Sequence, residues 1–151
     1  MYYWRTNRLV DSIKANSLSE SNKKDYYIGS SIITLIVMCI AILGGADNKY
    51  MLLATGMLSL IIILFGINIT FKTNGGDEGK DYIARVVMLS FPLLIKVYLF
   101  SFIVAILLGI VSSLMLGNNT IVIEWLGLLI TFAYQTIYFW RLNVHLGKIN
   151  S

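Results

Sequence analysis

Charged residues are scarce in this sequence. Asp, Glu, Lys and Arg make up 13% of its 151 residues, whereas soluble globular domains carry roughly 25%. Hydrophobic residues make up 57%. Too few polar side chains remain to cover the surface of a soluble domain, and the hydrophobic content excludes an intrinsically disordered chain. We therefore expect most of the chain to lie in lipid.

Cysteine, histidine and proline occur once each, at Cys39, His145 and Pro92. A lone cysteine excludes a disulfide framework, a four-thiolate zinc site and a C-x-x-C redox centre, and with them the small four-helix membrane oxidoreductases. We expect Cys39 to behave as a small apolar residue. His145 has no second histidine or carboxylate nearby in the sequence, so we expect it on the surface. The sequence thus predicts no catalytic residue, cofactor or metal site, and a protein that is not an enzyme.

Four apolar segments are long enough to cross a membrane. A bilayer core about 30 Å thick needs about 20 apolar residues in a helix. The segments that meet this length are residues 27–45, 50–71, 97–117 and 121–140. The sequence therefore predicts an all-α fold, a polytopic membrane protein whose single domain, residues 1–151, is a four-transmembrane-helix bundle.

The third apolar run is longer than one span requires. It begins at Val86 and is interrupted only by Lys96, so as one helix it would extend for about 48 Å. We predict that residues 82–95 form a cytoplasmic helical extension of the third span, bent at Pro92 and outside the hydrocarbon core.

The start of the chain, residues 2–15, predicts an amphipathic helix. Its apolar residues share one face and its basic residues lie opposite: Tyr2, Leu9, Val10 and Ile13 against Arg5, Arg8 and Lys14. A helix with this pattern can lie in the headgroup plane of a membrane. Ser17 and Glu20 have the spacing of a capping box, so we expect the first long helix to begin near Ser17.

The basic residues predict the orientation. Ten of the 12 Lys and Arg residues precede the first span, lie between the second and third, or follow the fourth. The opposite loops hold only Lys49. The positive-inside rule then places both termini in the cytoplasm (N-in/C-in) of a cell inner membrane. The outer turns are short, so we expect a protein partner to approach from the cytoplasm.

Two charged residues fall within or beside the predicted spans, Lys96 and Glu124. Charge inside a membrane is costly and marks functional sites. Lys96 lies about 30 Å from the outer turn, at the inner interface, where its ammonium group can snorkel to water. We interpret Glu124 as a carboxylate at the outer interface, with a ring of carboxylates at a pore mouth as the alternative.

Small residues recur every four positions along the third span: Ser101, Ala105, Gly109, Ser113 and Gly117. In lipid, such a stripe permits close approach between helices. It packs either inside one bundle or against another copy of the chain. The extension over residues 82–95 favours the second interpretation, because we expect the short cytoplasmic segments of one chain to leave it uncovered. We therefore predict a homo-oligomer with this stripe as its interface.

The loop at residues 72–81 has a superficial likeness to a phosphate-binding loop. The G-x-x-x-x-G-K-[ST] pattern would need Gly at Asn74 and Ser or Thr at Asp81. Asp77 and Glu78 would also repel a phosphate. We interpret the loop as an Asn-Gly turn leading into a helix, with a contact surface for a cytoplasmic partner as the alternative. The residues expected to contact that partner are Trp4, Arg5, Arg8, Asp77, Glu78 and Arg85.

The architecture favours a non-enzymatic membrane subunit that self-associates and recruits or regulates a cytoplasmic protein partner. Small prokaryotic four-span proteins serve in larger membrane assemblies, including phage-defence systems, and we expect such a role by analogy. One alternative is a small oligomeric channel or membrane-permeabilising effector, with a pore lined by Ser101, Ser112, Ser113, Gln135 and Asn68. Another is a membrane immunity protein against a toxin. Beyond the lipid bilayer, we expect neither a small-molecule substrate nor direct nucleic acid binding.

Overall fold

The computed structural model is all-α, as the sequence predicts. It describes residues 2, 4–43, 49–115 and 120–150; helices make up 90% of the structure, and these ranges contain no strand. The elements are α1 (Thr6–Lys14), α2 (Glu20–Leu43), α3 (Lys49–Thr73), the short 3-10 helix η1 (Gly76–Glu78), α4 (Tyr82–Met115) and α5 (Thr120–Asn150).

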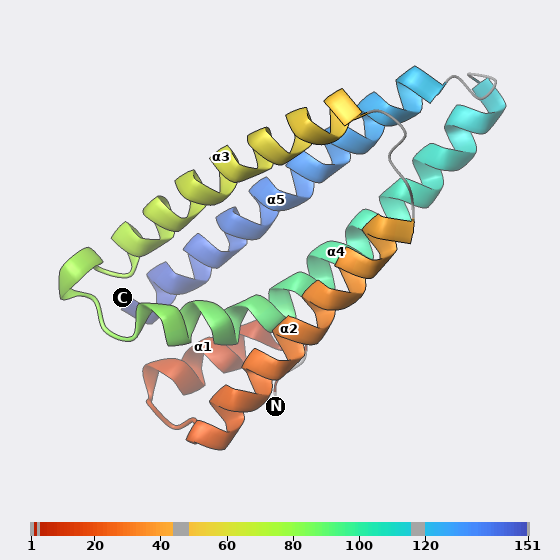
Figure 1. Cartoon of the computed structure of the whole chain (residues 1–151). Helices are drawn as coiled ribbons and strands as arrows, with labels where there is room; N and C mark the ends of the chain where they lie inside the picture. Colours follow the sequence, from red (N-terminus) through yellow and green to blue (C-terminus); the bar gives the residue numbers. More distant parts are fainter. Residues whose placement is uncertain (1, 3, 44–48, 116–119, 151) are drawn as a thin grey trace.

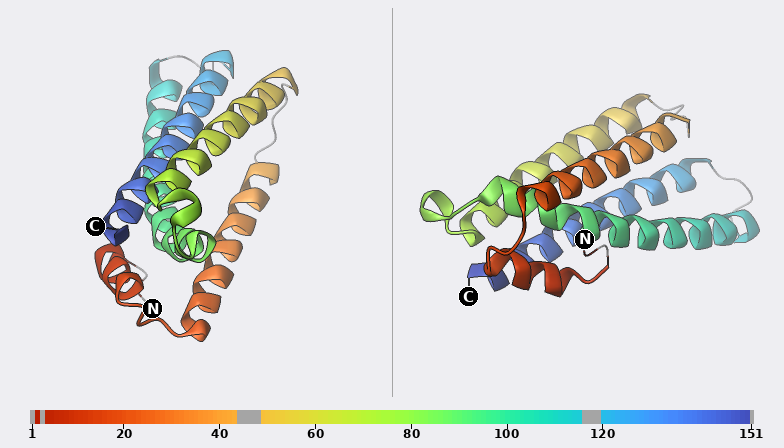
Figure 2. Two further views of the ribbon diagram at one scale, coloured as in Figure 1. Left: turned by 90° about the vertical axis from the view of Figure 1, so that its left-hand side faces the viewer. Right: turned by 90° about the horizontal axis from the view of Figure 1, so that it is seen from below.

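The four long helices pack in the order α3, α5, α4, α2, and α1 packs on α5 and α4. Figure 1 shows α3 beside α5 and α2 beside α4, with α1 at the end of the molecule where both termini lie. The two further views in Figure 2 show the same arrangement. We call this end, formed by α1, the starts of α2 and α4 and the ends of α3 and α5, the basal end.

A glycine facing a phenylalanine ring brings the helices of each pair together. A Cβ atom added at Gly29 of α2 would overlap the ring of Phe91 in α4, and one added at Gly66 of α3 would overlap the ring of Phe139 in α5. The missing side chain lets each ring pack directly on the neighbouring backbone. These two contacts fix how closely the pairs approach.

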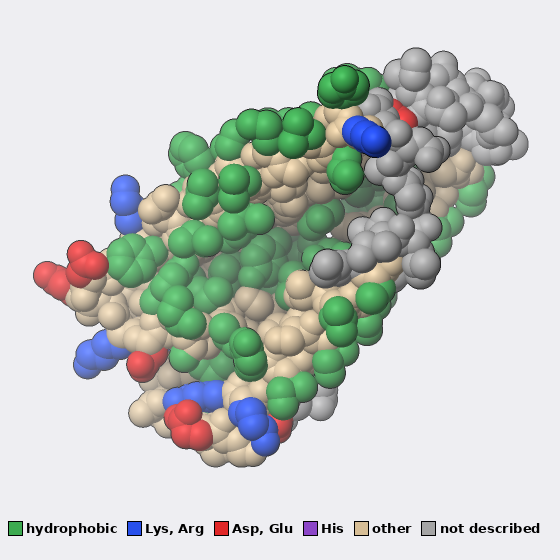
Figure 3. Space-filling view, viewed as in Figure 1, with side chains coloured by type: hydrophobic (Ala, Val, Ile, Leu, Met, Phe, Trp, Pro, Cys, Tyr) green, Lys and Arg blue, Asp and Glu red, His purple; other side chains and the backbone are tan. Residues whose placement is uncertain are grey.

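Within the described residues, two helices are long and apolar enough to cross a membrane: α3 and the section Tyr82–Val111 of α4. The only buried residues of α3 are Gly66 and Thr70, and large apolar side chains such as Phe65 and Leu53 are exposed. Figure 3 shows apolar side chains spread over the long helices, while most charged side chains gather at the basal end. Monomeric soluble proteins rarely expose apolar patches of this extent.

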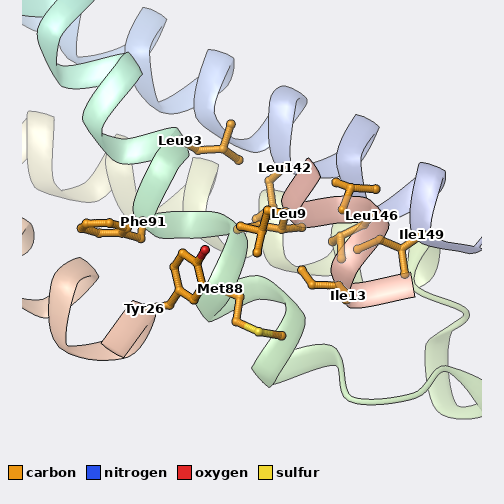
Figure 4. Close-up of a cluster of buried hydrophobic side chains, with 11 residues drawn as sticks. Leu9, Ile13, Tyr26, Met88, Phe91, Leu93, Leu142, Leu146 and Ile149 are labelled. Atoms are coloured by element: carbon orange, nitrogen blue, oxygen red, sulfur yellow. The ribbon is translucent and has the colours of Figure 1, made fainter. Parts of the chain in front are cut away.

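The buried core lies at the basal end. It draws on α1, α2, α4 and α5 and consists of Leu9, Val10, Ile13, Tyr26, Met88, Leu89, Phe91, Leu93, Leu142, Leu146 and Ile149 (Figure 4). The ring of Tyr26 packs edge-on against that of Phe91, with centroids 6.1 Å apart. Burial of each large apolar side chain contributes about 1.5–3 kcal/mol to stability. We call this cluster the basal core.

The apolar face of α1 is buried in the basal core and is not available to the membrane surface. Leu9 and Val10 are buried against α4 and α5. The placement of this helix in the headgroup plane is therefore wrong for its apolar face. The apolar face of α1 serves to pack on α4 and α5.

The extension of the third span is covered within one chain, contrary to our expectation. Residues 82–95 form the first part of α4, which changes direction along its length and contains Pro92 (Figure 1). Met88, Leu89 and Leu93 are buried. The prediction failed because α5 continues to Asn150, past the predicted end of the span, and α1 folds back onto it. Excess apolar length thus no longer favours an oligomer.

The first long helix begins at Glu20, three residues after the predicted start at Ser17. The N–H of Asn22 donates to Oγ of Ser19 over 3.3 Å, which makes Ser19 the N-cap of α2. Ser17 instead donates its hydroxyl to the carbonyl of Ser12 over 3.2 Å, beside the end of α1.

The loop between α3 and α4 contains the predicted Asn-Gly turn. Gly75 has a φ of 104°, which a residue with a side chain rarely adopts. The buried side chain of Asn74 donates to the carbonyl of Lys80 over 3.2 Å and accepts from the Arg85 guanidinium over 3.0 Å. Arg85 also donates to Oδ1 of Asn150 over 2.8 Å. The predicted partner contact at Arg85 is thus engaged within the chain, where it ties the loop to the end of α5.

Candidate functional site

A cavity of about 770 Å³ lies between α4 and α5, next to the basal core. The segment that precedes and begins α1 forms its basal wall. The lining residues are Trp4, Arg5, Thr6, Asn7, Arg8, Leu93, Lys96, Val97, Phe100, Ser101, Val104, Ile130, Ala133, Tyr134, Ile137, Trp140, Arg141 and His145. We call it the basic cavity.

The lining is divided into a basic part and an apolar part. Four cations line the basic part: Arg5, Arg8, Lys96 and Arg141. No carboxylate lines the cavity among the residues that the structure describes. The α4 side continues as Phe100 and Val104, and the α5 side includes Ile130 and Ile137. This combination suits a ligand that has an anionic group and an apolar body.

Lys96 joins the wall of the cavity to the start of the chain. Its ammonium group donates to Oγ1 of Thr6 over 2.7 Å and lies 5.5 Å from the ring centroid of Trp4. Both partners are neutral. Nearby, the backbone N–H of Tyr2 donates to the hydroxyl of Tyr26 over 2.6 Å, which holds Tyr2 against α2. The N-terminal segment is thus held across the basal end of the cavity.

The structure separates the two charged residues that the sequence singled out. Lys96 lies on the cavity wall, whereas Glu124 lies near the start of α5, at the end opposite to the basal core. The Lys96 side chain is partly buried, so it is not fully solvated. Its ammonium group bonds to a hydroxyl, and it forms no ion pair with a carboxylate in the described ranges.

His145 is buried, which corrects the prediction of a surface histidine. Its side chain lines the cavity, the residue is 7% exposed, and its Nδ1 atom has no hydrogen-bond partner among the described residues. Burial, together with the positive charges of Lys148, Lys96 and Arg141, lowers the pKa of His145 to about 4. The imidazole is therefore neutral at pH 7.

A signal for this burial exists in the sequence. Leu142, Leu146 and Ile149 follow the spacing of one helical face, and all three are buried. This pattern marks residues 141–150 as a packed helix that continues past the predicted end of the fourth span at residue 140. His145 precedes Leu146 on the same packed turn.

A second cavity, of about 350 Å³, lies among α2, α3, α4 and α5. Its position is where Figure 3 shows the hollow between α2 and α3. Uncharged polar groups meet there: Ser90 and Tyr138 share a hydrogen bond of 2.6 Å, and Gln135 donates to Ser59 over 2.9 Å. These bonds connect α4 to α5 and α5 to α3.

The predicted pore-lining residues do not come together. Ser101 lines the basic cavity, Gln135 lines the second cavity, and Asn68 is exposed and donates to the carbonyl of Leu64 in its own helix. The side chains of Ser112 and Ser113 lie outside the described part of the structure. The described positions thus give no common stripe that favours a channel.

The small-residue stripe has an exposed section. Ser101 is half-buried at the cavity, while Ala105 and Gly109 are exposed on α4. The side chain of Ser113 and the whole of Gly117 lie outside the described residues. The described stripe therefore packs only in part inside the chain.

The predicted partner contacts fall into two groups. Trp4, Arg5 and Arg8 are exposed around the basic cavity, and Asp77 and Glu78 are exposed on η1. Both groups lie at the basal end.

No protein-family model, curated protein or solved structure matches this chain. Within the described residues, no group of three or more His, Cys, Asp or Glu side chains is placed to hold a metal ion.

Proposed function

We propose that this protein is a non-enzymatic subunit of a cell inner membrane that self-associates and recruits or regulates a cytoplasmic protein partner. One observation carries the proposal. The buried core and most of the charge lie at the basal end, while the rest of the long helices exposes apolar side chains (Figure 3). A protein divided in this way has one part suited to water and one part suited to lipid.

The proposed topology has four spans with both termini in the cytoplasm. α2 and α4 begin at the basal end, and α3 and α5 end there (Figure 1). The ten basic residues counted by the positive-inside rule therefore belong to this end, and Lys49 begins α3 at the other. The lengths of α3 and α4 support the two central spans, and α2 and α5, which run alongside them, supply the other two.

The partner surface is proposed at the basal end. Trp4 is 60% exposed beside Arg5 and Arg8, and η1 presents Asp77 and Glu78 to solvent. Aromatic and arginine side chains are enriched where proteins bind one another. Acidic and basic groups on separate parts of this surface provide orientation for a partner of complementary charge.

Self-association is proposed through the exposed section of the stripe on α4. Ala105 and Gly109 present little side chain there, so the backbone of a second helix can approach closely. A leucine at either position would hold the helices apart by its own width.

Native mass spectrometry of the protein released from nanodiscs tests this proposal. We expect wild-type oligomers at micromolar concentration and a smaller oligomeric fraction for Gly109→Leu. Gly56→Leu is the matched control, because Gly56 is an exposed glycine of α3 at which an added Cβ meets no atom within 4 Å. A wild-type protein that stays monomeric, or a Gly109→Leu variant that assembles like wild type, contradicts self-association through α4.

A further inference from the structure

The basic cavity combines features that match one class of ligand. Its basic part faces the basal end, and its apolar part is built from α4 and α5. We propose that it binds an anionic phospholipid of the inner leaflet, with the phosphate among the basic side chains and the upper acyl chains along the apolar wall. The inference rests on the membrane location in the proposed function and goes beyond it.

The uncompensated charge of the cavity is the first argument. The Lys96 ammonium donates to the Thr6 hydroxyl and lies beside the Trp4 ring, with no ion pair to a carboxylate among the described residues, and the guanidinium carbon of Arg141 lies 5.2 Å from the ring centroid of Trp140. The ion pairs found in the described part of the chain, Lys23–Glu20 and Lys24–Asp25, lie elsewhere. Like charges gathered around one cavity repel one another, and a bound phosphate relieves that repulsion.

The second argument is the buried imidazole. His145 is more than nine-tenths buried at the cavity wall, and its Nδ1 atom has no partner among the described residues. A buried polar atom without a hydrogen-bond partner lowers the stability of the folded protein. A nearby phosphate would favour the protonated imidazole and thereby reduce this penalty.

The shape of the site favours a lipid over a water-soluble anion. Phe100 lines the cavity yet is 60% exposed, so the apolar part opens sideways onto the surface that faces lipid. Trp4 and Trp140, at 60% and 58% exposure, flank the basic part. Tryptophan prefers the boundary between headgroups and acyl chains. A free phosphate would use the basic side chains but leave the apolar wall without a role.

The size agrees with a headgroup and the first part of its chains. Ligand cavities usually measure about 300–1,000 Å³. A volume of about 770 Å³ lies within that range. The remaining chain length would lie along the exposed apolar faces of α4 and α5.

The test measures which lipids the protein retains and how lipid binding changes the pKa of His145. The protein is placed in nanodiscs of phosphatidylcholine with and without phosphatidylglycerol, and lipids retained per protomer are counted by native mass spectrometry. We expect phosphatidylglycerol to be retained in preference to phosphatidylcholine. In a parallel NMR titration, short-chain phosphatidylglycerol should raise the pKa of His145, while short-chain phosphatidylcholine should leave it unchanged.

The double variant Lys96→Gln/Arg141→Gln should weaken phosphatidylglycerol binding by about 25-fold, because each basic residue beside an anionic headgroup contributes about fivefold. Lys14→Gln/Lys80→Gln removes the same charge from exposed positions outside the cavity and should change binding less than twofold. Should the first variant fail to fold, Arg5→Gln/Arg8→Gln carries the same test from exposed positions on the cavity rim, with a similar loss expected.

Three outcomes would overturn the inference: equal retention of both lipids, equal loss in the cavity and control variants, or inorganic phosphate binding as tightly as the short-chain lipid. Competition by an amphipathic peptide but not by lipid would assign the cavity to a protein segment instead. Failure of the protein to insert into membranes contradicts the proposed function, whereas insertion without headgroup preference contradicts only this inference.

Discussion

The ammonium group of Lys96 donates a 2.7 Å hydrogen bond to the hydroxyl of Thr6, 90 residues earlier in the chain. Thr6 is the first residue of α1 and is 4% exposed. The bond therefore joins the start of the chain to the middle of the longest helix. It also places the basic residues of the N-terminal segment on the wall of the basic cavity.

Replacing Thr6 by valine should lower the free energy of unfolding by about 1.5–3 kcal/mol, the range for a hydrogen bond to a charged group. Valine keeps the shape of the side chain but leaves the partly buried ammonium of Lys96 without its acceptor. Thermal unfolding in detergent, followed by tryptophan fluorescence, measures the change. Thr34→Val is the control, since Thr34 is exposed and bonds within its own helix. Equal midpoints for Thr6→Val and wild type would show that the bond does not hold the segment.

The contact between Gly66 and Phe139 makes a matched pair of glycine variants informative. Gly66→Ala forces a methyl group into the Phe139 ring and should destabilise the packing of α3 on α5 by about 1–3 kcal/mol. Gly56→Ala, on the same helix, meets open space and should be neutral or slightly stabilising, because alanine favours helix. Thermal unfolding of both variants in the same detergent measures the difference. Indistinguishable midpoints would mean that the helices separate easily at this contact.

Cysteine labelling tests the proposed orientation. In a Cys39→Ser background, a cysteine at Glu78 should react with a membrane-impermeant maleimide only after permeabilisation, and one at Lys49 should react from outside. Both positions are exposed, so access to the reagent depends on the side of the membrane. External labelling at position 78 would contradict the proposed orientation. Positions 48 and 118, on the expected outer turns, lie outside the described residues.

Local pattern predicted the helices of this protein but not their packing. The length of the apolar runs predicts α3 and α4, and the spacing of Leu9, Val10 and Ile13 predicts the amphipathic α1. The same spacing does not distinguish a lipid surface from a protein surface, so the burial of α1 on α4 and α5 could not be read from it.

The basic cavity could not be predicted, because its parts are far apart in the sequence. Arg5, Lys96 and Arg141 each have an ordinary explanation as basic residues beside a span. Only the folded chain brings them to one cavity. The burial of His145 was not predicted for a related reason: the predicted span ends at residue 140, and the helix that buries His145 continues past it.

The burial of His145 predicts a pH dependence of stability. Its pKa is about 4 in the folded protein and about 6.5 in an unfolded chain, so the unfolded state binds more protons between these values. Stability is therefore complete above pH 6.5 and is lost as the pH falls towards 4, by about 3 kcal/mol at most for this group. The basic groups Lys148, Lys96 and Arg141 oppose its protonation.

Unfolding midpoints of wild type and His145→Gln at pH 7.0 and pH 4.5 isolate this contribution. The carboxylates titrate in both proteins, so only the difference between their slopes reports on His145. We expect the wild type to lose more stability than the variant on acidification. Identical slopes would show that the imidazole is not buried in a neutral form. If phosphatidylglycerol occupies the basic cavity, its phosphate favours the protonated imidazole, and the difference between the two slopes should shrink in nanodiscs that contain this lipid.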